Sequence, residues 1–571
     1  MIDLLITGGT VLDGTGGDPY IDDVGIDGGR IVALGHVEQS ARRTIDAAGL
    51  HVAPGFVDLH THYDAQVFWD PALTPSCFHG VTTVFAGNCG FSIAPFRADD
   101  GDYLMRMLAR VEGIPVAALE AGVPWGSWST TAEYLAAVAS GGLALNMGFL
   151  VGHSAIRRAV MGVEASTRAA NALELAAMEV LLAAGLTAGG IGFSSSAAPT
   201  HNDDLGHPVP SRAATTEEFL ALCRVVERHP GTTVEMVPGQ GAFDQNIGLL
   251  AAMSAAANRP LNWNVLQINT EDADLVEARL ASSDAAASAA GGRLVPLTMP
   301  DALRTRLSFE SGFLFDTLPG WGEAMALPAA EKLALLADPV RRRALATQAA
   351  TAPRAFVLRG FNNWAGMTIG ETEQDRYRGR VVGEIAETEG RDAFDVLCDI
   401  VVADRLRTGV YTPPRGDDDD SWKLRADVWG RGSVVVGASD AGAHLDMIST
   451  WSYPTTLLAE AVRRRGLLSW QEAVRLLTGA PAALYGLRDR GRLALGYRAD
   501  VTLFDPERVG PRPTEWRDDL PAGAGRLYAE ADGVEAVLVN GVAVVDQGRL
   551  TGDRPGQLIR SGVDTHTVTA R

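Results

Sequence analysis

The sequence is poor in cysteine and has no long apolar run. Only four cysteines occur among 571 residues, too few for a disulfide scaffold. We find no stretch of about 18 uninterrupted apolar residues, the length that a membrane-spanning helix needs. The start of the chain also lacks the basic segment and long apolar segment of a secretory signal. We therefore expect a cytoplasmic protein with reduced thiols and no membrane partner.

Basic residues are also scarce relative to acidic ones. The chain has 49 Lys and Arg against 70 Asp and Glu, which gives a formal net charge of -21. A surface this acidic disfavours nucleic acid and anionic membranes as partners. We expect a small-molecule substrate and no nucleic acid, and the sequence leaves a homo-oligomer open.

Both ends of the chain are rich in short strand-like segments, whereas the middle is not. Glycine and aspartate clusters separate the segments of the first 50 or so residues. The same texture returns near the C-terminus, where Asn540-Gly541 is a hairpin-turn signal. We predict that both ends form one small β-sandwich domain. The expected boundaries are 1–53 and 486–571 for the two parts of this domain, and 54–485 for the central unit.

The central unit alternates strand-like and helix-like segments. Eight candidate strands with helical patterns between them are the count for a (β/α)8 TIM barrel. About 135 residues separate the last two candidates, which is too long for one connection, so we expect a helical insertion within about 300–430. The candidate strands are 55–59, 80–86, 143–151, 189–194, 232–237, 261–266, 293–297 and 434–440.

The carboxyl ends of these strands carry residues that bind metals. In a TIM barrel, functional side chains lie at these ends. His60 and His62 are two apart, so on a strand their imidazoles point the same way. With the Cys89 thiol and the Asp440 carboxylate they form a constellation typical of a metal site. The alternatives are that His60 and His62 are structural, that Cys89 is a buried thiol in a glycine-rich turn, and that Asp440 caps the following helix.

Several segments resemble a known family. The run Pro54-Gly55-Phe56-Val57-Asp58-Leu59-His60-Thr61-His62, the late Ser439-Asp440 and the split β-domain resemble the amidohydrolase superfamily. Gly87-Asn88-Cys89-Gly90 and the segment 151–157 resemble its D-aminoacylase group, the N-acyl-D-amino-acid deacylases. The resemblance implies that His60, His62 and Cys89 are ligands of one metal. It also implies that Asp440 is the catalytic acid and base beside that metal.

The chain departs from this group at two strand ends. Group members carry a histidine at the fifth strand, where this chain has Glu235, and His-His-Lys at the sixth, where it has Asn264-Val265-Leu266-Gln267. Those histidines would hold a second metal, and the lysine, with an arginine also missing here, would bind a substrate carboxylate. We expect one ion, and the sequence argues against a second. Glu235 is either a further ligand or a polar strand end.

Three other histidines lie where substrate contacts are expected. His153 follows the third strand, His201 lies in a polar loop after the fourth, and His444 follows Asp440 by four residues. Loops at this end of a barrel often carry substrate contacts. We expect these histidines to contact substrate or support the metal ligands, and structural or surface roles are the alternative.

The leading hypothesis is a zinc-dependent hydrolase that cleaves an amide-type C–N bond, as an N-acyl-amino-acid deacylase does. The alternative keeps the barrel without hydrolysis, as a lyase, cyclase, isomerase or decarboxylase with one metal or none. A binding protein without catalysis is a third hypothesis. The combination of His60, His62 and Asp440 argues against it, because binding alone needs no proton acceptor beside a metal.

Overall fold

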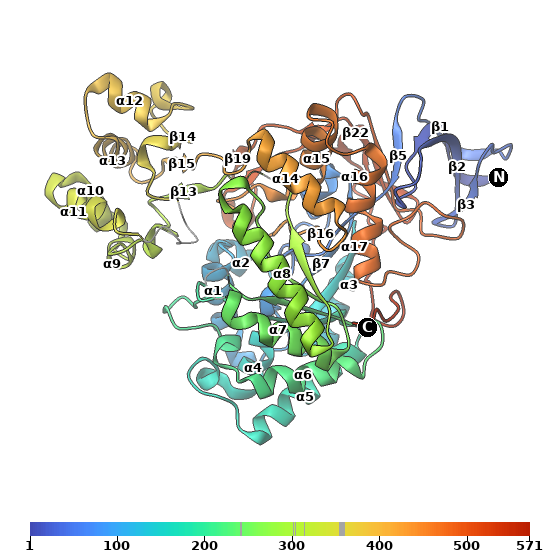
Figure 1. The fold of residues 1–571 in the computed structure, drawn as a ribbon, viewed down its shortest axis with the longest axis horizontal. Coiled ribbons are helices and arrows are strands. Elements are labelled where there is room, and N and C mark those ends of the chain that lie inside the picture. The colour runs from blue at the N-terminus through green and yellow to red at the C-terminus, as the bar shows by residue number, and fades with distance from the viewer. Residues whose placement is uncertain (240–242, 301, 303, 313, 353–359, 571) are drawn as a thin grey trace. The chain divides into compact units, whose positions relative to one another are not determined.

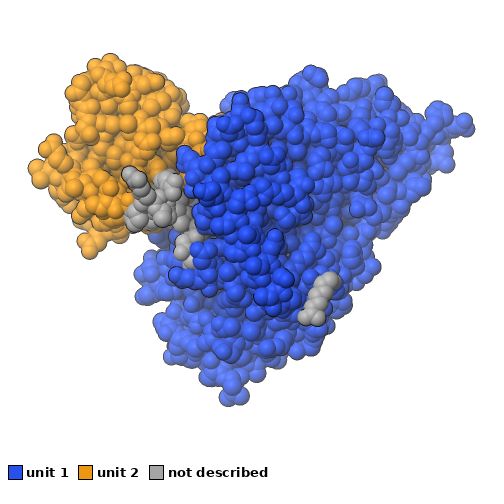
Figure 2. Space-filling model, in the orientation of Figure 1, with its two compact units in different colours: residues 1–301, 418–445, 449–571 blue, residues 302–417, 446–448 orange. Residues whose placement is uncertain are grey.

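A computed structural model describes residues 1–239, 243–300, 302, 304–312, 314–352 and 360–570. Contacts divide the chain into two compact units, shown in Figure 2. Unit 1 comprises residues 1–301, 418–445 and 449–571, and unit 2 comprises residues 302–417 and 446–448.

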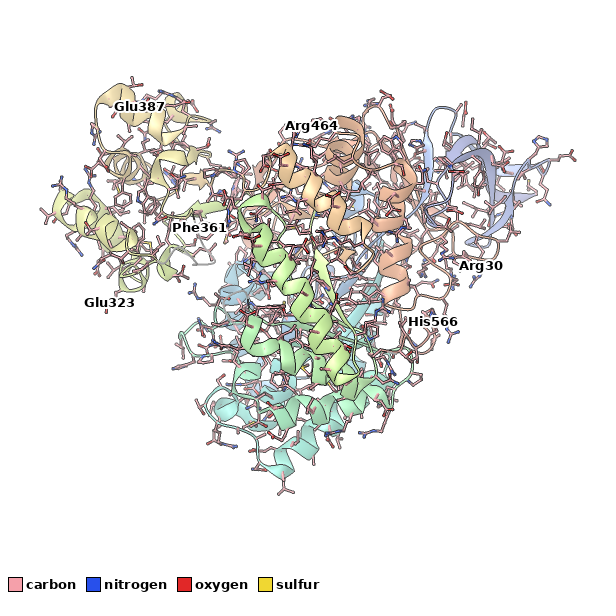
Figure 3. All side chains as sticks on the ribbon, viewed as in Figure 1. Arg30, Glu323, Phe361, Glu387, Arg464 and His566 are labelled. Carbon is pink, nitrogen blue, oxygen red and sulfur yellow. The ribbon has the colours of Figure 1, made fainter. Side chains whose placement is uncertain are left out.

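Strands from both ends of the chain share one nine-stranded sheet in unit 1, as predicted. The junction is the antiparallel pair of β5 and β17, whose side chains are all buried. Arg30, labelled in Figure 3, also joins the two ends, since its guanidinium lies 2.9 Å from the Asp489 carboxylate. The strands are β1 (Ile2–Val11), β2 (Tyr20–Asp27), β3 (Arg30–Leu34), β4 (Ala41–Asp46), β5 (His51–Pro54), β17 (Val501–Phe504), β22 (Val534–Val539), β23 (Val542–Asp546) and β24 (Arg549–Leu550).

Eight parallel strands form the second sheet of unit 1. A parallel bridge between Thr61 and Ala441 brings the ends of the first and last strands together, which closes the sheet into the predicted (β/α)8 barrel. The strands are β6 (Phe56–Asp58), β7 (Val81–Ala86), β8 (Asn146–Gly152), β9 (Gly192–Ser196), β10 (Thr233–Val237), β11 (Leu261–Trp263), β12 (Leu294–Thr298) and β16 (Val435–Val436).

Helices follow most barrel strands and pack against them (Figure 1). Thr215 caps the start of α6, because its hydroxyl accepts a hydrogen bond from the Glu218 amide at 3.3 Å. The helices are α1 (Gly101–Val111), α2 (Val116–Gly122), α3 (Thr131–Gly141), α4 (His153–Met161), α5 (Ala172–Thr187), α6 (Thr216–Glu227), α7 (Phe243–Ala257), α8 (Ala273–Ala290), α14 (Asp419–Gly430), α15 (Tyr453–Leu457), α16 (Trp470–Leu477) and α17 (Gly479–Leu484).

Unit 2 has its own apolar core, in which Phe309, Phe315 and Trp321 are fully buried. Its elements are β13 (Arg306–Ser308), α9 (Gly322–Met325), α10 (Ala329–Ala337), α11 (Pro339–Ala349), β14 (Thr368–Ile369), α12 (Val382–Glu389), α13 (Ala393–Ala403) and β15 (Gly409–Tyr411). None of the described helices of the chain is long and apolar enough to cross a membrane.

Candidate metal centre

His60 and His62 follow β6 in an extended stretch at the mouth of the barrel. Their Nε2 atoms lie 3.3 Å apart, and both residues are buried. Thr61 between them turns away and donates its hydroxyl to the Phe85 carbonyl. The two imidazoles therefore face one point, as the His-x-His spacing predicts.

Cys89 lies in the turn after β7 and faces the same point. Its Sγ is 3.5 Å from His60 Nε2 and 3.8 Å from His62 Nε2. The turn is tight, since Gly87 and Cys89 both have positive φ angles, 78° and 57°. A Cβ on Gly87 would lie 2.3 Å from the Leu150 carbonyl oxygen, so glycine is needed there.

Asp440 follows β16, the last barrel strand, and its carboxylate faces the same two imidazoles. Its Oδ1 is 3.1 Å from His62 Nε2 and 3.5 Å from His60 Nε2, and its amide donates to the His60 carbonyl. Its φ angle of 59° is unusual for a residue with a side chain and marks a conformation held by its surroundings. The structure thus brings together all four residues predicted to bind metal.

These distances fit a zinc ion. With Zn–N and Zn–O bonds of about 2.0–2.2 Å and a Zn–S bond of about 2.3 Å, neighbouring ligand atoms in a tetrahedral shell lie roughly 3.3–3.6 Å apart. The donor atoms of His60, His62, Cys89 and Asp440 are separated by 3.1 to 3.8 Å where pairs are in contact. Nitrogen, sulfur and carboxylate oxygen are also the donor types that zinc accepts.

Burial and neighbouring charges shift the pKa values of Cys89 and Asp440 in opposite directions. Burial raises the pKa of the Cys89 thiol well above its usual range, and the charges of Glu235 and Glu112 add to this effect. A thiol must lose its proton to bind a metal, and the metal itself favours that loss. Burial alone would raise the pKa of Asp440, but hydrogen bonds with His60 and His62 outweigh it and hold that pKa well below the usual range.

Glu235, at β10, supports Cys89 from behind. One carboxylate oxygen accepts the Cys89 amide at 2.9 Å, and the other accepts a hydrogen bond from the Asn264 side chain. The second oxygen is 4.0 Å from His60 Nδ1. Burial raises the pKa of Glu235 to about 7. Both carboxylate oxygens are therefore engaged by protein donors, and a ligand role for Glu235 stays a prediction.

Glu112 is a buried carboxylate at this site that the sequence analysis missed. It caps the C-terminus of α1, and its Oε1 lies 3.3 Å from His62 Nδ1. With His62 and Asp440 it forms a second group of donor atoms lying within 4.8 Å of one another. Glu112 lies away from the strand ends, and a glutamate before a glycine at a helix end gives no signal of its own in the sequence.

The three further histidines have different surroundings. His444 Nε2 is 3.8 Å from Asp440 Oδ2. His201 Nδ1 is hydrogen-bonded to Ser196 Oγ at 2.7 Å. Burial, and to a smaller extent the charge of His444, lowers the pKa of His201 to about 3. Both thus lie near the donor set. His153 is fully buried. Its Nδ1 lies 2.8 Å from Ser195 Oγ, and its Nε2 lies 2.8 Å from a Glu218 carboxylate oxygen. The ring of His153 is therefore held by Ser195 and Glu218 and not by any of the four donors, and its predicted role in substrate binding or ligand support stays a prediction.

The chain is similar to known proteins over almost its whole length. The chain is 29% identical to a D-aminoacylase of Alcaligenes xylosoxydans xylosoxydans, over 98% of this chain and 97% of that protein. A solved D-aminoacylase aligns with a TM-score of 0.66 and 26% identity, over 98% of this chain and 100% of that one. A solved N-acyl-D-glutamate deacylase of Bordetella bronchiseptica, in complex with zinc and a phosphonate inhibitor, has a TM-score of 0.65 and 25% identity, over 98% and 99% of the two chains. Because the amidohydrolase family model matches residues 43–545, this chain belongs to the amidohydrolase family, as its sequence predicts.

Proposed function

We propose that the protein is a single-zinc hydrolase that cleaves the amide C–N bond of an N-acylated small molecule. The observation that carries this proposal is that His60 Nε2 and His62 Nε2 lie 3.3 Å apart and both face Cys89 Sγ, within 3.8 Å, and Asp440 Oδ1, within 3.5 Å. A zinc ion held there would polarise the amide carbonyl and lower the pKa of a water molecule.

The choice of one ion rests on this chain's own residues. Where the D-aminoacylase group carries histidines for a second metal, Glu235 and Asn264 hydrogen-bond to each other. The solved D-aminoacylase has a binuclear centre described by one-metal activation and second-metal attenuation. A chain with ligands for one ion is therefore compatible with the same hydrolytic chemistry.

Asp440 is the proton carrier in this proposal. Its side chain is 31% exposed, against 4% for those of His60 and His62, so it is the donor that a substrate reaches most easily. The carboxylate takes a proton from the attacking water as the new C–O bond forms. It returns that proton to the nitrogen as the C–N bond breaks, which releases a carboxylic acid and an amine.

The relatives act on N-acyl-D-amino acids, as their names state, including D-aspartate and D-glutamate derivatives. We expect simple N-acyl-D-amino acids to be poor substrates of this chain. The lysine and arginine that would bind their carboxylate in the D-aminoacylase group are missing, and the sixth strand here ends in Asn264-Val265-Leu266-Gln267 instead of His-His-Lys. A buried carboxylate without a cationic partner is unfavourable by several kcal/mol on a rough scale.

The experiment is a hydrolysis screen of neutral N-acyl amines and of N-acyl amino acids of both hands, before and after removal of metal by a chelator. The proposal predicts amide hydrolysis that chelation abolishes and zinc restores. Chelator-insensitive hydrolysis would contradict the metal dependence. A kcat/KM on the order of 10⁵ M⁻¹s⁻¹ or more for a simple N-acyl-D-amino acid, typical of enzymes on their own substrates, would contradict the expected specificity.

A further inference from the structure

Helix α1 ends in a residue that local preferences do not explain. Glu112 is its C-cap, with its amide bonded to the Leu108 carbonyl at 2.8 Å, and it is only 3% exposed. An anionic side chain at a helix C-terminus faces the negative end of the helix dipole. Burial of a carboxyl group is also unfavourable unless a partner compensates for it. The position of Glu112 therefore calls for a specific partner.

That partner is His62. Glu112 Oε1 lies 3.3 Å from His62 Nδ1, and both side chains are 4% exposed. The other ring nitrogen, Nε2, faces His60 Nε2 at 3.3 Å and Asp440 Oδ1 at 3.1 Å. The two nitrogens of one imidazole thus face different groups, with a carboxylate on one side and the donor set on the other.

Main-chain contacts hold Glu112 in this place. Its carbonyl accepts the amide N–H of His444, in the segment that also carries Asp440. Gly113, with a φ of 61°, lets the chain pass close to that segment, since a Cβ there would lie 3.2 Å from the His444 Cα. The end of α1 is therefore fixed against the segment after β16, and the Glu112 side chain is presented to His62 by a rigid support.

We propose that Glu112 is a positioning residue that orients His62 as a metal ligand. With its Oε1 3.3 Å from His62 Nδ1, the carboxylate favours the tautomer that carries its proton on Nδ1 and leaves the Nε2 lone pair facing His60, Cys89 and Asp440. Metal-binding histidines commonly donate their second N–H to a carboxylate in this way, and loss of that partner weakens metal binding. This inference rests on the proposed function, because it requires His62 to be a ligand.

His60 offers a contrast within the same site. Its Nδ1 has no hydrogen-bond partner among the described residues, and the nearest carboxylate oxygen, of Glu235, is 4.0 Å away. Glu235 instead holds the amide of Cys89. The two buried glutamates therefore support different ligands, and a variant of Glu112 should act through His62 alone.

The test compares Glu112→Met, Glu112→Gln and Glu120→Gln. Methionine fills the space without a strong acceptor, whereas the glutamine amide oxygen can still accept the N–H of His62. Glu120 is exposed on α2, so its variant is a control for the loss of one acidic charge. The readouts are zinc affinity by chelator competition, zinc content and the melting temperature of the metal-free protein.

We expect Glu112→Met to weaken zinc binding by about 10- to 100-fold. Glu112→Gln should recover most of this loss, and Glu120→Gln should bind zinc as the wild type does. The metal-free melting temperature of Glu112→Met should stay close to that of the wild type. A purely space-filling role predicts equal zinc affinity in all variants.

The outcomes separate this inference from the proposed function. Wild-type affinity in Glu112→Met would overturn the role of Glu112 and leave the proposed function standing. Two zinc ions in the wild type and one in Glu112→Gln would make Glu112 a ligand of a second ion and also overturn its positioning role. A wild-type protein that binds no zinc would instead contradict the proposed function itself.

Discussion

Among the four donors, Asp440 differs from the others in its exposure. Its Oδ1 faces the two histidines, while its Oδ2 lies 3.8 Å from His444 Nε2. The carboxylate thus has one oxygen beside the two metal-facing imidazoles and the other beside His444. This arrangement suits a group that both stands beside a metal and carries a proton.

Replacement of Asp440 by asparagine should nearly abolish turnover. The amide has almost the same shape, so the fold should persist, but it cannot accept a proton from water. Loss of a general base costs roughly 10²- to 10⁴-fold. Turnover of a screened substrate, melting temperature and metal content should be measured together. A stable, metal-loaded variant that keeps more than about a tenth of wild-type turnover would show that another group, with His444 the first candidate, moves the proton.

At the scale of elements, the turn after β7 places Cys89 through bonds from several parts of the barrel. The amide of Gly87 donates to Asp64 at 2.9 Å, and the amide of Gly90 donates to Ser194 Oγ at 3.0 Å. The amide of Cys89 donates to Glu235. Three neighbouring amides thus have side-chain acceptors on three different segments. This explains how a cysteine is held at a positive φ angle.

Gly87→Ala should damage this turn, whereas Gly141→Ala should not. At Gly87 a Cβ meets the Leu150 carbonyl oxygen at 2.3 Å and φ is 78°, so we expect a loss of at least about 1–2 kcal/mol in unfolding free energy and weaker metal binding. At Gly141, which ends α3, a Cβ has no neighbour within 4 Å, and alanine should stabilise the helix by up to about 1 kcal/mol. Thermal unfolding and metal content check both. Equal behaviour of the two variants would mean that the turn tolerates a side chain.

The sequence predicts the barrel elements well because hydrophobic runs and turns are local signals. Each of the eight candidate strands overlaps a barrel strand, although β16 is only two residues long. The prediction extended this strand to Asp440, but the chain leaves strand geometry at Gly437, whose φ is 141°. The four converging donors were predicted from their places at strand ends. The predicted domain boundaries and the roles of the site residues stay predictions.

Other features of the site depend on tertiary contacts that a sequence pattern does not contain. Glu112 lies at a helix end, and only the fold brings that end to His62. His153 follows its strand as expected, but it begins α4, and its ring is held between Ser195 and Glu218. A position at a strand end therefore indicated the region of the site without indicating where each side chain points.

At the scale of the whole molecule, buried ionisable groups act on stability in opposite directions. Burial lowers the pKa of His51 and His79 to about 4, so the unfolded state binds more protons between about pH 4 and 6.5, and stability falls as pH falls in that range. Burial raises the pKa of Asp58 to about 6 and of Asp64 to about 7, which favours the folded state as pH falls. We expect these effects to offset each other in the metal-free protein.

A variant of His79 should reveal how much the lowered pKa of this histidine changes the stability with pH. His79 is fully buried between Thr455 Oγ1 and the Ala529 carbonyl, and it must stay neutral there. His79→Gln should be less stable than the wild type at pH 7, because the wild-type contacts fit imidazole. As pH falls from 7 to 4 the difference should shrink by up to about 3 kcal/mol, since only the wild type has this histidine to protonate on unfolding. Urea unfolding at both pH values measures it, and a difference that stays constant would refute the lowered pKa.

At this scale the proposed function requires that each chain hold one ion between His60, His62, Cys89 and Asp440. The most direct test is the metal content per chain, by elemental analysis, of the purified wild type and of His60→Ala and His62→Ala. We expect one zinc ion per chain in the wild type. Each variant should lose the ion together with activity, because the remaining donors cannot complete a tetrahedral shell. Two ions in the wild type, or full metal content in both variants, would contradict this expectation.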